Sequence, residues 1–323
     1  SAMRSISDPS WEYAGPTGPT GLGGSGRLNR VVPRPNVPGE WWACAPAGGL
    51  WRTVDGGDTW TEQGNGQLNS IGVSDLAFHP EDPLRMWIAT GDGDFGDTRS
   101  IGVWTTEDGG ASWSATALDW APYMGRTMTR MLVHPANPDT LLAASSLGVY
   151  RSANGGSSWT RTIAGDFASL EMDPANPNHL LAGAFGNVIA ESHDAGLSWT
   201  TDYLDGSSFG LSRIALAFSP SAPDTVYAMA GKTSNQGFAG LWRSTDGGSS
   251  WTPRLLDGDG PNLLGWTVAG EDQGGQAWYD LCLAVDPHDP DVLFAGGVGS
   301  ARRACKKGPK VVCRLLSLSA SQE

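Results

Sequence analysis

Lysine is nearly absent from this sequence: four of its 323 residues are lysine, and three of those lie within residues 299–323. The formal net charge is −13, and residues 1–301 carry about 15 basic against 33 acidic side chains. A surface this acidic repels phosphate backbones and anionic membrane surfaces. We therefore expect no nucleic-acid partner, and neutral or cationic ligands suit the main body better.

Long hydrophobic runs are also missing, because no stretch of 18 or more apolar residues occurs. Such a run is what a membrane-spanning helix needs, so no membrane insertion is predicted. No signal-peptide pattern opens the chain either. We interpret residues 1–10, which start Ser-Ala-Met, as a cloning remnant or an unstructured lead.

Cysteine and histidine are scarce as well. The four cysteines have no metal-binding spacing and two of them fall within residues 299–323, so they define no disulfide framework and their oxidation state stays open. The five histidines are scattered along the chain, which gives no support to a metalloenzyme. These residues are Cys44, Cys282, Cys305 and Cys313, and His79, His134, His179, His193 and His288.

Glycine (45), proline (21) and tryptophan (15) are abundant, which favours short strands and tight turns over helices. An eight-residue box recurs five times, with the pattern Ser/Thr, any, Asp, any, Gly, any, Ser/Thr, Trp. The copies are TVDGGDTW (53–60), TEDGGASW (106–113), SANGGSSW (152–159), SHDAGLSW (192–199) and STDGGSSW (244–251). Upstream of each box, two apolar strands flank a Pro-x-x-Pro turn, and a sixth such pair lies at 283–297.

The box tryptophans are 53, 46, 40 and 52 residues apart, close to the ~40 to 45 residues of a four-stranded propeller blade with variable loops. We therefore predict an all-β protein, a β-propeller over residues 11–298 with five blades and part of a sixth. Ser10–Tyr13 would suit a ring-closing strand but has no evident partner, so the predicted ring is incomplete and its open edges favour association. The basic residues 299–323 continue no blade, and we interpret them as a frameshift product or a disordered tail.

The box residues have structural roles that follow from their chemistry. The acidic or amide side chain can accept hydrogen bonds from its own turn, glycines supply positive φ, and tryptophan packs between blades. We assign these roles to Asp55, Trp60, Asp108, Trp113, Asn154, Trp159, Asp194, Trp199, Asp246 and Trp251.

The boxes resemble those of Asp-box (BNR-repeat) propellers, a group that includes sialidases, xyloglucanase-type glycoside hydrolases and sortilin-type domains. Segments such as APAGGLWRTVDGGDTW (45–60) and TGDGDFGDTRSIGVWTTEDGG (90–110) look most like secreted, sortilin-like bacterial BNR proteins. The resemblance implies an extracellular or cell-surface location. The sialidase Arg-Ile-Pro motif is missing, and residues 45–51 lack the acidic residue of the xyloglucanase Thr-Asp-Val-Gly-Gly segment.

Candidate sites are expected on the face opposite the boxes, where loops are free to vary. Charged residues at the starts of innermost strands should surround the channel mouth, either paired with one another or binding a ligand; they are Arg30, Asp75, Arg130, Arg213 and Asp280. The loop 91–98 offers the oxygens of Asp92, Asp94 and Asp97 to a calcium ion, or forms a solvated turn. Trp266 and Trp278, near Glu271 and Asp272, could stack on sugar rings.

Two functions remain open on this evidence. The first is a non-catalytic binding or scaffold propeller of an exported bacterial protein, which recognises carbohydrate or a protein partner. The alternative is a glycoside hydrolase, which needs paired carboxylates ~5 Å or ~6.5 to 9.5 Å apart. The catalytic candidates are Asp75, Asp92, Asp94, Asp272 and Asp280, and none is set apart by its local sequence.

Overall fold

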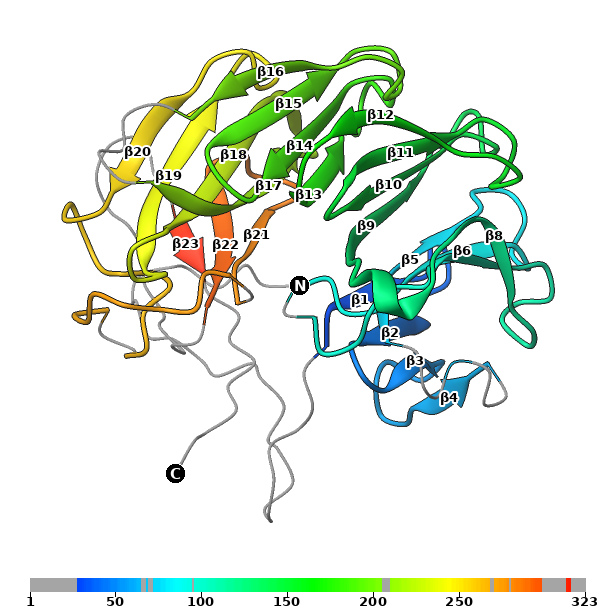
Figure 1. Cartoon of the computed structure of the whole chain (residues 1–323). Coiled ribbons are helices and arrows are strands. Elements are labelled where there is room, and N and C mark those ends of the chain that lie inside the picture. Colours follow the sequence, from blue (N-terminus) through cyan, green and yellow to red (C-terminus); the bar gives the residue numbers. More distant parts are fainter. Residues whose placement is uncertain are drawn as a thin grey trace.

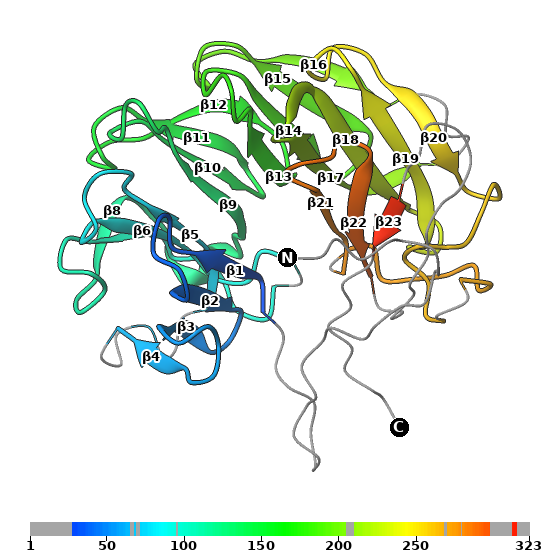
Figure 2. The same cartoon turned by 180° about the vertical axis from the view of Figure 1, so that it is seen from behind.

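The computed structural model describes residues 28–64, 68, 72–94, 96–204, 210–267, 270–278, 280–297 and, for the backbone alone, 312–314. Six β-sheets lie side by side in an arc, with their first strands towards its centre and their fourth strands at the periphery (Figures 1 and 2). The prediction of an all-β propeller is confirmed. The predicted closing strand 10–13 and Cys305 lie outside the described residues.

Five sheets have four antiparallel strands in sequence order. The first sheet holds β1 (Arg30–Pro33), β2 (Trp41–Ala45), β3 (Gly49–Thr53) and β4 (Thr61–Gln63), and the second holds β5 (Val73–Phe78), β6 (Met86–Thr90), β7 (Gly102–Thr106) and β8 (Ser114–Asp119). The third sheet holds β9 (Met128–Val133), β10 (Leu141–Ser145), β11 (Gly148–Ser152) and β12 (Thr160–Ala164). The fourth holds β13 (Phe167–Met172), β14 (Leu180–Ala184), β15 (Val188–Ser192) and β16 (Thr200–Tyr203). The fifth holds β17 (Leu211–Ser219), β18 (Ala222–Lys232), β19 (Phe238–Ser244) and β20 (Thr252–Leu256).

The sixth sheet has three strands, β21 (Cys282–Val285), β22 (Val292–Gly296) and β23 (Val312–Arg314). β23 pairs parallel with β22, unlike the antiparallel pairs of the other sheets. The rest of the basic tail lies outside the described residues, so its interpretation stays a prediction. The helical content of the described chain is one short 3₁₀ turn, Pro122–Met124, and no helix there is long and apolar enough to cross a membrane.

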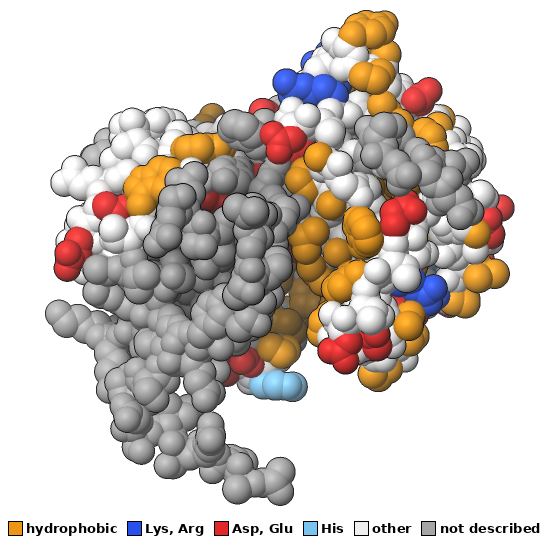
Figure 3. All heavy atoms as spheres, turned by 90° about the horizontal axis from the view of Figure 1, so that it is seen from below, with side chains coloured by type: hydrophobic (Ala, Val, Ile, Leu, Met, Phe, Trp, Pro, Cys, Tyr) orange, Lys and Arg blue, Asp and Glu red, His pale blue; other side chains and the backbone are white. Residues whose placement is uncertain are grey.

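Successive sheets contact one another through their innermost strands, from β1 and β2 against β5 to β17 against β21. Within the described residues, no interface of comparable extent joins the last sheet to the first. Large exposed hydrophobic side chains are concentrated in the first sheet, among them Val31, Trp41, Trp51 and Val54. Figure 3 shows hydrophobic side chains gathered on the side where Figure 1 places the first sheets. Exposed apolar side chains that gather on one side of a protein are typical of an interaction surface.

The connections divide the arc into two faces. The box turns join third to fourth strands and the Pro-x-x-Pro turns join first to second strands, so both lie on one side, which we call the box face. The two turns of a blade are tied together by one recurring bond, for example from Gly109 N to Leu84 O at 2.9 Å and from Gly155 N to Asp139 O at 2.9 Å. Loops between second and third strands lie on the opposite side, which we call the loop face.

Each box turn is held by hydrogen bonds between its own residues. In the second sheet, Thr106 Oγ1 donates to Asp108 Oδ1 at 2.7 Å, and Ser112 N donates to the same oxygen at 2.9 Å. Gly109 and Gly110 have φ of 75° and 96°, a region that L side chains rarely adopt. The fourth sheet departs from this pattern, because Ala195 adopts φ 56° where the other boxes have glycine.

Three of the box tryptophans, Trp113, Trp159 and Trp199, contact the preceding sheet. Trp113 is 4% exposed and packs with Trp42 and Leu50 of the first sheet. The indole N–H of Trp159 donates to Thr116 of the second sheet at 3.3 Å, and that of Trp199 donates to Thr162 of the third sheet at 3.0 Å. Each of these side chains therefore links its own blade to the preceding one.

Candidate functional site

Three of the charged residues at the starts of the innermost strands, Arg30, Asp75 and Arg130, pair with one another. Asp75 on β5 is completely buried, and its carboxylate lies 3.2 Å from Arg30 Nε and 2.9 Å from Arg130 Nη1. Met131 N also donates to it at 2.9 Å. Arg130 extends the network to Glu171 of the fourth sheet at 3.2 Å. The network therefore ties the first four sheets together at the centre of the arc.

Arg213 on β17 is held by two partners. Its Nη2 lies 2.7 Å from Asp94 Oδ1, and its Nη1 donates to the carbonyl of Trp278 at 3.0 Å. The loop that carries Asp94 is folded around Asp92, which is fully buried and accepts from Asp94 N and Asp97 N at 3.0 Å each. A calcium ion at this loop stays a prediction.

A polar cleft of about 430 Å³ opens on the loop face between the β18–β19 loop and the segment after β20. It is lined, among others, by Lys232, Asn235, Asp257, Asn262, Glu271 and Asp272. Lys232 Nζ and Asp257 Oδ2 form an ion pair at 2.9 Å within the lining. The cleft thus offers amide, carboxylate and ammonium groups at a site that the sequence predicted only in part, through Glu271 and Asp272.

Asp272 shapes the rim of this cleft. Its carboxylate accepts from Trp266 N at 2.6 Å and from Thr267 Oγ1 at 2.6 Å. Partial burial opposes ionisation of Asp272, but the hydrogen bonds from Thr267 and Trp266 outweigh it and lower the pKa of this carboxyl. In this turn the Trp266 side chain is 50% exposed. Asn262 holds the returning part of the loop, because its side-chain amide donates to Asp272 O and Gly274 O at 2.9 Å.

Trp278 and Asp280, the other two predicted residues of this segment, are less exposed to solvent than Trp266. Trp278 is partly buried, and its carbonyl holds Arg213 as described above. Asp280 is also partly buried and comes just before β21, where its backbone N donates to Gln276 O at 3.0 Å. Of the residues predicted in this segment, Glu271 and Asp272 line the cleft, and Trp266 is bonded to Asp272 through its backbone.

The box aspartates are anions held within their turns. A hydrogen bond from Ser112, supported by one from Thr106, lowers the pKa of Asp108 to about 2. Bonds from Ser244 and Ser250 lower the pKa of Asp246 to about 2 in the same way. The pKa of Asp55 is also lowered, first by the hydrogen bond from Thr53. Asn154 makes the corresponding bonds in the third sheet without a charge, accepting from Ser158 N at 2.9 Å.

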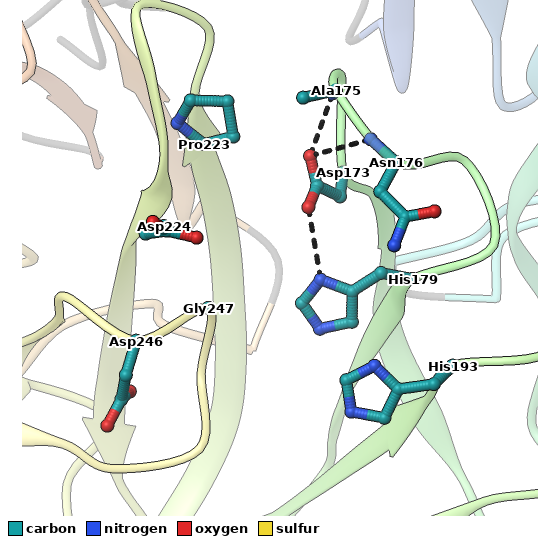
Figure 4. Close-up of a pocket in the computed structure, with 9 residues that line it drawn as sticks. All are labelled: Asp173, Ala175, Asn176, His179, His193, Pro223, Asp224, Asp246 and Gly247. Carbon is teal, nitrogen blue, oxygen red and sulfur yellow. Dashed lines mark hydrogen bonds and ion pairs between the residues drawn. The ribbon is translucent and has the colours of Figure 1, made fainter.

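A second hollow, of about 460 Å³, lies on the box face between the fourth and fifth sheets (Figure 4). The histidines are scattered in the sequence, but the fold brings two of them together here, because His179 and His193 stack with ring centroids 4.7 Å apart. A signal in the sequence could have revealed them. The second box position reads Val54, Glu107, Ala153, His193 and Thr245 in the five repeats, so histidine occurs in one copy alone.

Comparisons with known proteins bear on the fold. No family model matches the chain, and no curated protein matches it. Among solved structures, an ancestral GH74 enzyme is 19% identical, with a TM-score of 0.61 over 83% of this chain and 34% of that enzyme. The GH74 xyloglucanase from Xanthomonas campestris is 19% identical, with a TM-score of 0.49 over 86% of this chain and 51% of the xyloglucanase.

YCF48 from Cyanidioschyzon merolae is 18% identical, with a TM-score of 0.47 over 75% of this chain and 89% of that protein. The chain spans about a third of the ancestral enzyme and about half of the xyloglucanase. Likeness at this identity is evidence about architecture and not about chemistry. Together with the six sheets and their connections, the match to the ancestral enzyme shows that this chain has a β-propeller fold.

Proposed function

We propose that this chain is a non-catalytic binding propeller of the Asp-box (BNR) type, and that the loop-face cleft beside Trp266 holds a neutral carbohydrate. Support for the Asp-box assignment comes from the five box turns, whose side-chain oxygens accept hydrogen bonds from their own residues. The observation that carries the binding proposal is a polar cleft whose lining residue Asp272 holds the turn that exposes half of the Trp266 side chain.

The chemistry of the cleft suits a sugar. Saccharide rings stack on indole faces, while amide and carboxylate groups exchange hydrogen bonds with hydroxyls. The rim is held in place before any ligand arrives, since the Asp272 carboxylate fixes the Trp266 turn and the Asn262 amide fixes the backbone at Asp272. A preorganised rim reduces the entropy lost on binding.

The engagement of the carboxylates supports binding over hydrolysis. Asp75 is enclosed by two arginines, Asp94 is paired with Arg213, and Asp272 holds its own turn. A glycoside hydrolase needs one carboxylic acid and one free carboxylate on opposite sides of the scissile bond. These three side chains are already committed to structural bonds, so glycoside hydrolysis is the second candidate.

Isothermal titration calorimetry with neutral cello-, xylo- and manno-oligosaccharides of four to six sugars tests the proposal. We expect one site per chain, and we expect Trp266→Ala to weaken binding roughly tenfold, the scale of a lost aromatic contact. Trp51→Ala is the matched control, because Trp51 is also exposed but lies on β3 of the first sheet. Absence of binding, or equal loss in both variants, would contradict carbohydrate binding at this cleft. Release of reducing ends during the titration would favour the hydrolase.

We also propose that the chain acts outside the cell and that the first sheet contacts a partner. Its likeness to secreted Asp-box proteins supports the first statement, and the exposed Val31, Trp41 and Val54 support the second. The partner is a protein surface or a second copy of this chain. Light scattering across a concentration series distinguishes the two, because self-association raises the mass of the purified chain alone.

A further inference from the structure

Strand register brings three potential metal ligands onto one surface of the fourth sheet. β14 and β15 pair antiparallel with Leu180 opposite Ser192 and Leu181 opposite Glu191. His179 and His193 extend that register by one position and therefore face each other. Because side chains alternate along a strand, Glu191 points to the same side as His193. Figure 4 shows His179 and His193 side by side on one wall of the box-face hollow.

The donor atoms of these three side chains converge. Glu191 Oε1 lies 3.1 Å from His179 Nε2 and 3.2 Å from His193 Nε2, and one ligand atom from each residue lies within 4.8 Å of the other two. Among the described residues, these three are the histidine, cysteine or acidic side chains whose ligand atoms all lie that close to one another. The set comprises two imidazole nitrogens and one carboxylate oxygen.

Asp173 orients the buried histidine. Its Oδ2 lies 3.2 Å from His179 Nδ1, while its Oδ1 accepts from Ala175 N and Asn176 N at 2.8 and 3.2 Å (Figure 4). An ionised carboxylate can only accept a hydrogen bond, so Nδ1 carries the proton. In neutral imidazole, Nε2 is then an acceptor that faces another acceptor, Glu191 Oε1. This pairing requires a proton or a metal ion between the two atoms.

The surroundings favour a metal ion with an open coordination position. The His179 side chain is 6% exposed and Glu191 17%, whereas His193 is 66% exposed at the mouth of the hollow. Asp224 and Pro223 form the opposite wall (Figure 4), and the carboxylate of Asp224 adds to the negative potential. The net charge of −13 attracts cations to the whole molecule.

We propose that His179, Glu191 and His193 bind a divalent transition-metal ion of the zinc class on the box face. Two imidazoles and one carboxylate suit Zn²⁺, whereas Ca²⁺ and Mg²⁺ prefer all-oxygen ligands. Asp173 is a positioning residue, in the arrangement by which a carboxylate holds a metal-binding histidine through its other ring nitrogen. The remaining coordination position opens to the hollow. This site lies on the opposite face from the carbohydrate cleft and does not depend on it.

The test is calorimetric titration of the full chain, freed of metal with a chelator, using Zn²⁺ alone. We expect one site per chain, and we expect His193→Ala to weaken it at least a hundredfold. Asp173→Asn should cost ten- to a hundredfold, the usual effect of removing a carboxylate that orients a ligand. His288→Ala is the matched control, since His288 is exposed on the sixth sheet, and it should leave affinity unchanged.

A second readout uses Co²⁺, whose visible absorption reports ligand number and geometry. An intense visible band that His193→Ala abolishes supports a site built from these side chains. Circular dichroism of each variant checks the fold, and His193 is exposed enough for its removal to leave the fold intact. No saturable Zn²⁺ binding, or equal binding by wild type and His193→Ala, would overturn the proposal and leave a protonated His179 as the bridging cation.

Discussion

The third and fourth sheets are built alike and present different chemistry on the box face. Both contain a Pro-Ala-Asn-Pro turn, and Leu141 pairs with Ser152 as Leu180 pairs with Ser192. The cross-strand positions next to these pairs differ. They hold Thr140, Arg151 and Ala153 in the third sheet, and His179, Glu191 and His193 in the fourth. The blade scaffold therefore tolerates large changes at these positions, and a site can be built on one blade without altering the fold.

In the third sheet, Arg151 occupies the position that Glu191 occupies in the fourth. Its Nε donates to the carbonyl of Ala195 in the fourth sheet at 2.9 Å, so it links two blades where Glu191 lies between two histidines. The shared scaffold and the divergent chemistry can be tested separately.

The largest effect should come from the shared core. Leu142 and Leu181 occupy matching positions on β10 and β14, and both are completely buried. Leu142→Ala and Leu181→Ala should each lower the free energy of unfolding by about 4 kcal/mol, through lost burial and an unfilled cavity. Urea denaturation measures both. A cost below about 1 kcal/mol in one sheet alone would show that the two blades are not equivalent scaffolds.

Substitutions at matching positions of the innermost strands should have unequal effects on the free energy of unfolding. Arg130 on β9 is replaced at the matching position of β13 by Ser169, whose Oγ donates to Ile214 O at 2.9 Å. Arg130→Ala leaves the buried Asp75 with one arginine fewer and should cost about 3 kcal/mol, whereas Ser169→Ala should cost about 1 kcal/mol. The same denaturation assay applies. Equal costs would mean that the charge network adds little beyond a hydrogen bond.

The box turns of the two sheets should respond differently to acid. Asp194 is partly buried, but hydrogen bonds from Ser198 and Ser192 lower its pKa from 3.8 to about 2. A lowered pKa stabilises the fold above about pH 4, and that contribution is lost as the pH falls towards 2. Asp194→Asn should therefore cost up to about 1 kcal/mol at pH 7 and progressively less towards pH 2.

Asn154→Asp in the third sheet is the converse variant and should add the same pH dependence. Unfolding free energies at pH 7, 4 and 3 check both variants. A difference from wild type that does not change with pH would contradict the role given to the Asp194 charge.

The smallest change in stability should come from backbone conformation in the box turns of these two sheets. Gly155 adopts φ 65° in the third box, and Ala195 adopts φ 56° in the fourth. Ala195→Gly should relieve left-handed strain and stabilise the protein by about 0.5 kcal/mol, after the greater freedom of glycine in the unfolded chain is included. Thermal unfolding detects it as a small rise in Tm. Gly155→Ala, the reverse change, should lower Tm.

Structure could be predicted from the sequence where the interacting residues are close together along the chain. A box is eight residues long, and the bonds that hold it join residues two to four positions apart, as between Asp108 and Ser112. The strands around each box were predicted from the same local pattern. The cleft was predicted in part, because Glu271 and Asp272 share one segment, while Lys232 and Asn235 come from the end of β18 and the loop that follows it.

The sequence by itself determined that this chain forms four-stranded blades whose third and fourth strands are joined by box turns, because hydrogen bonds between near neighbours and the spacing of the box tryptophans specify each blade locally. Only the tertiary structure decided which charged and metal-binding groups meet. The network of Arg30, Asp75 and Arg130 spans three sheets, so it depends on how the blades curve around the arc. The meeting of His179 with His193 depends on the register of β14 against β15, where a shift of one residue would turn the side chains to opposite faces.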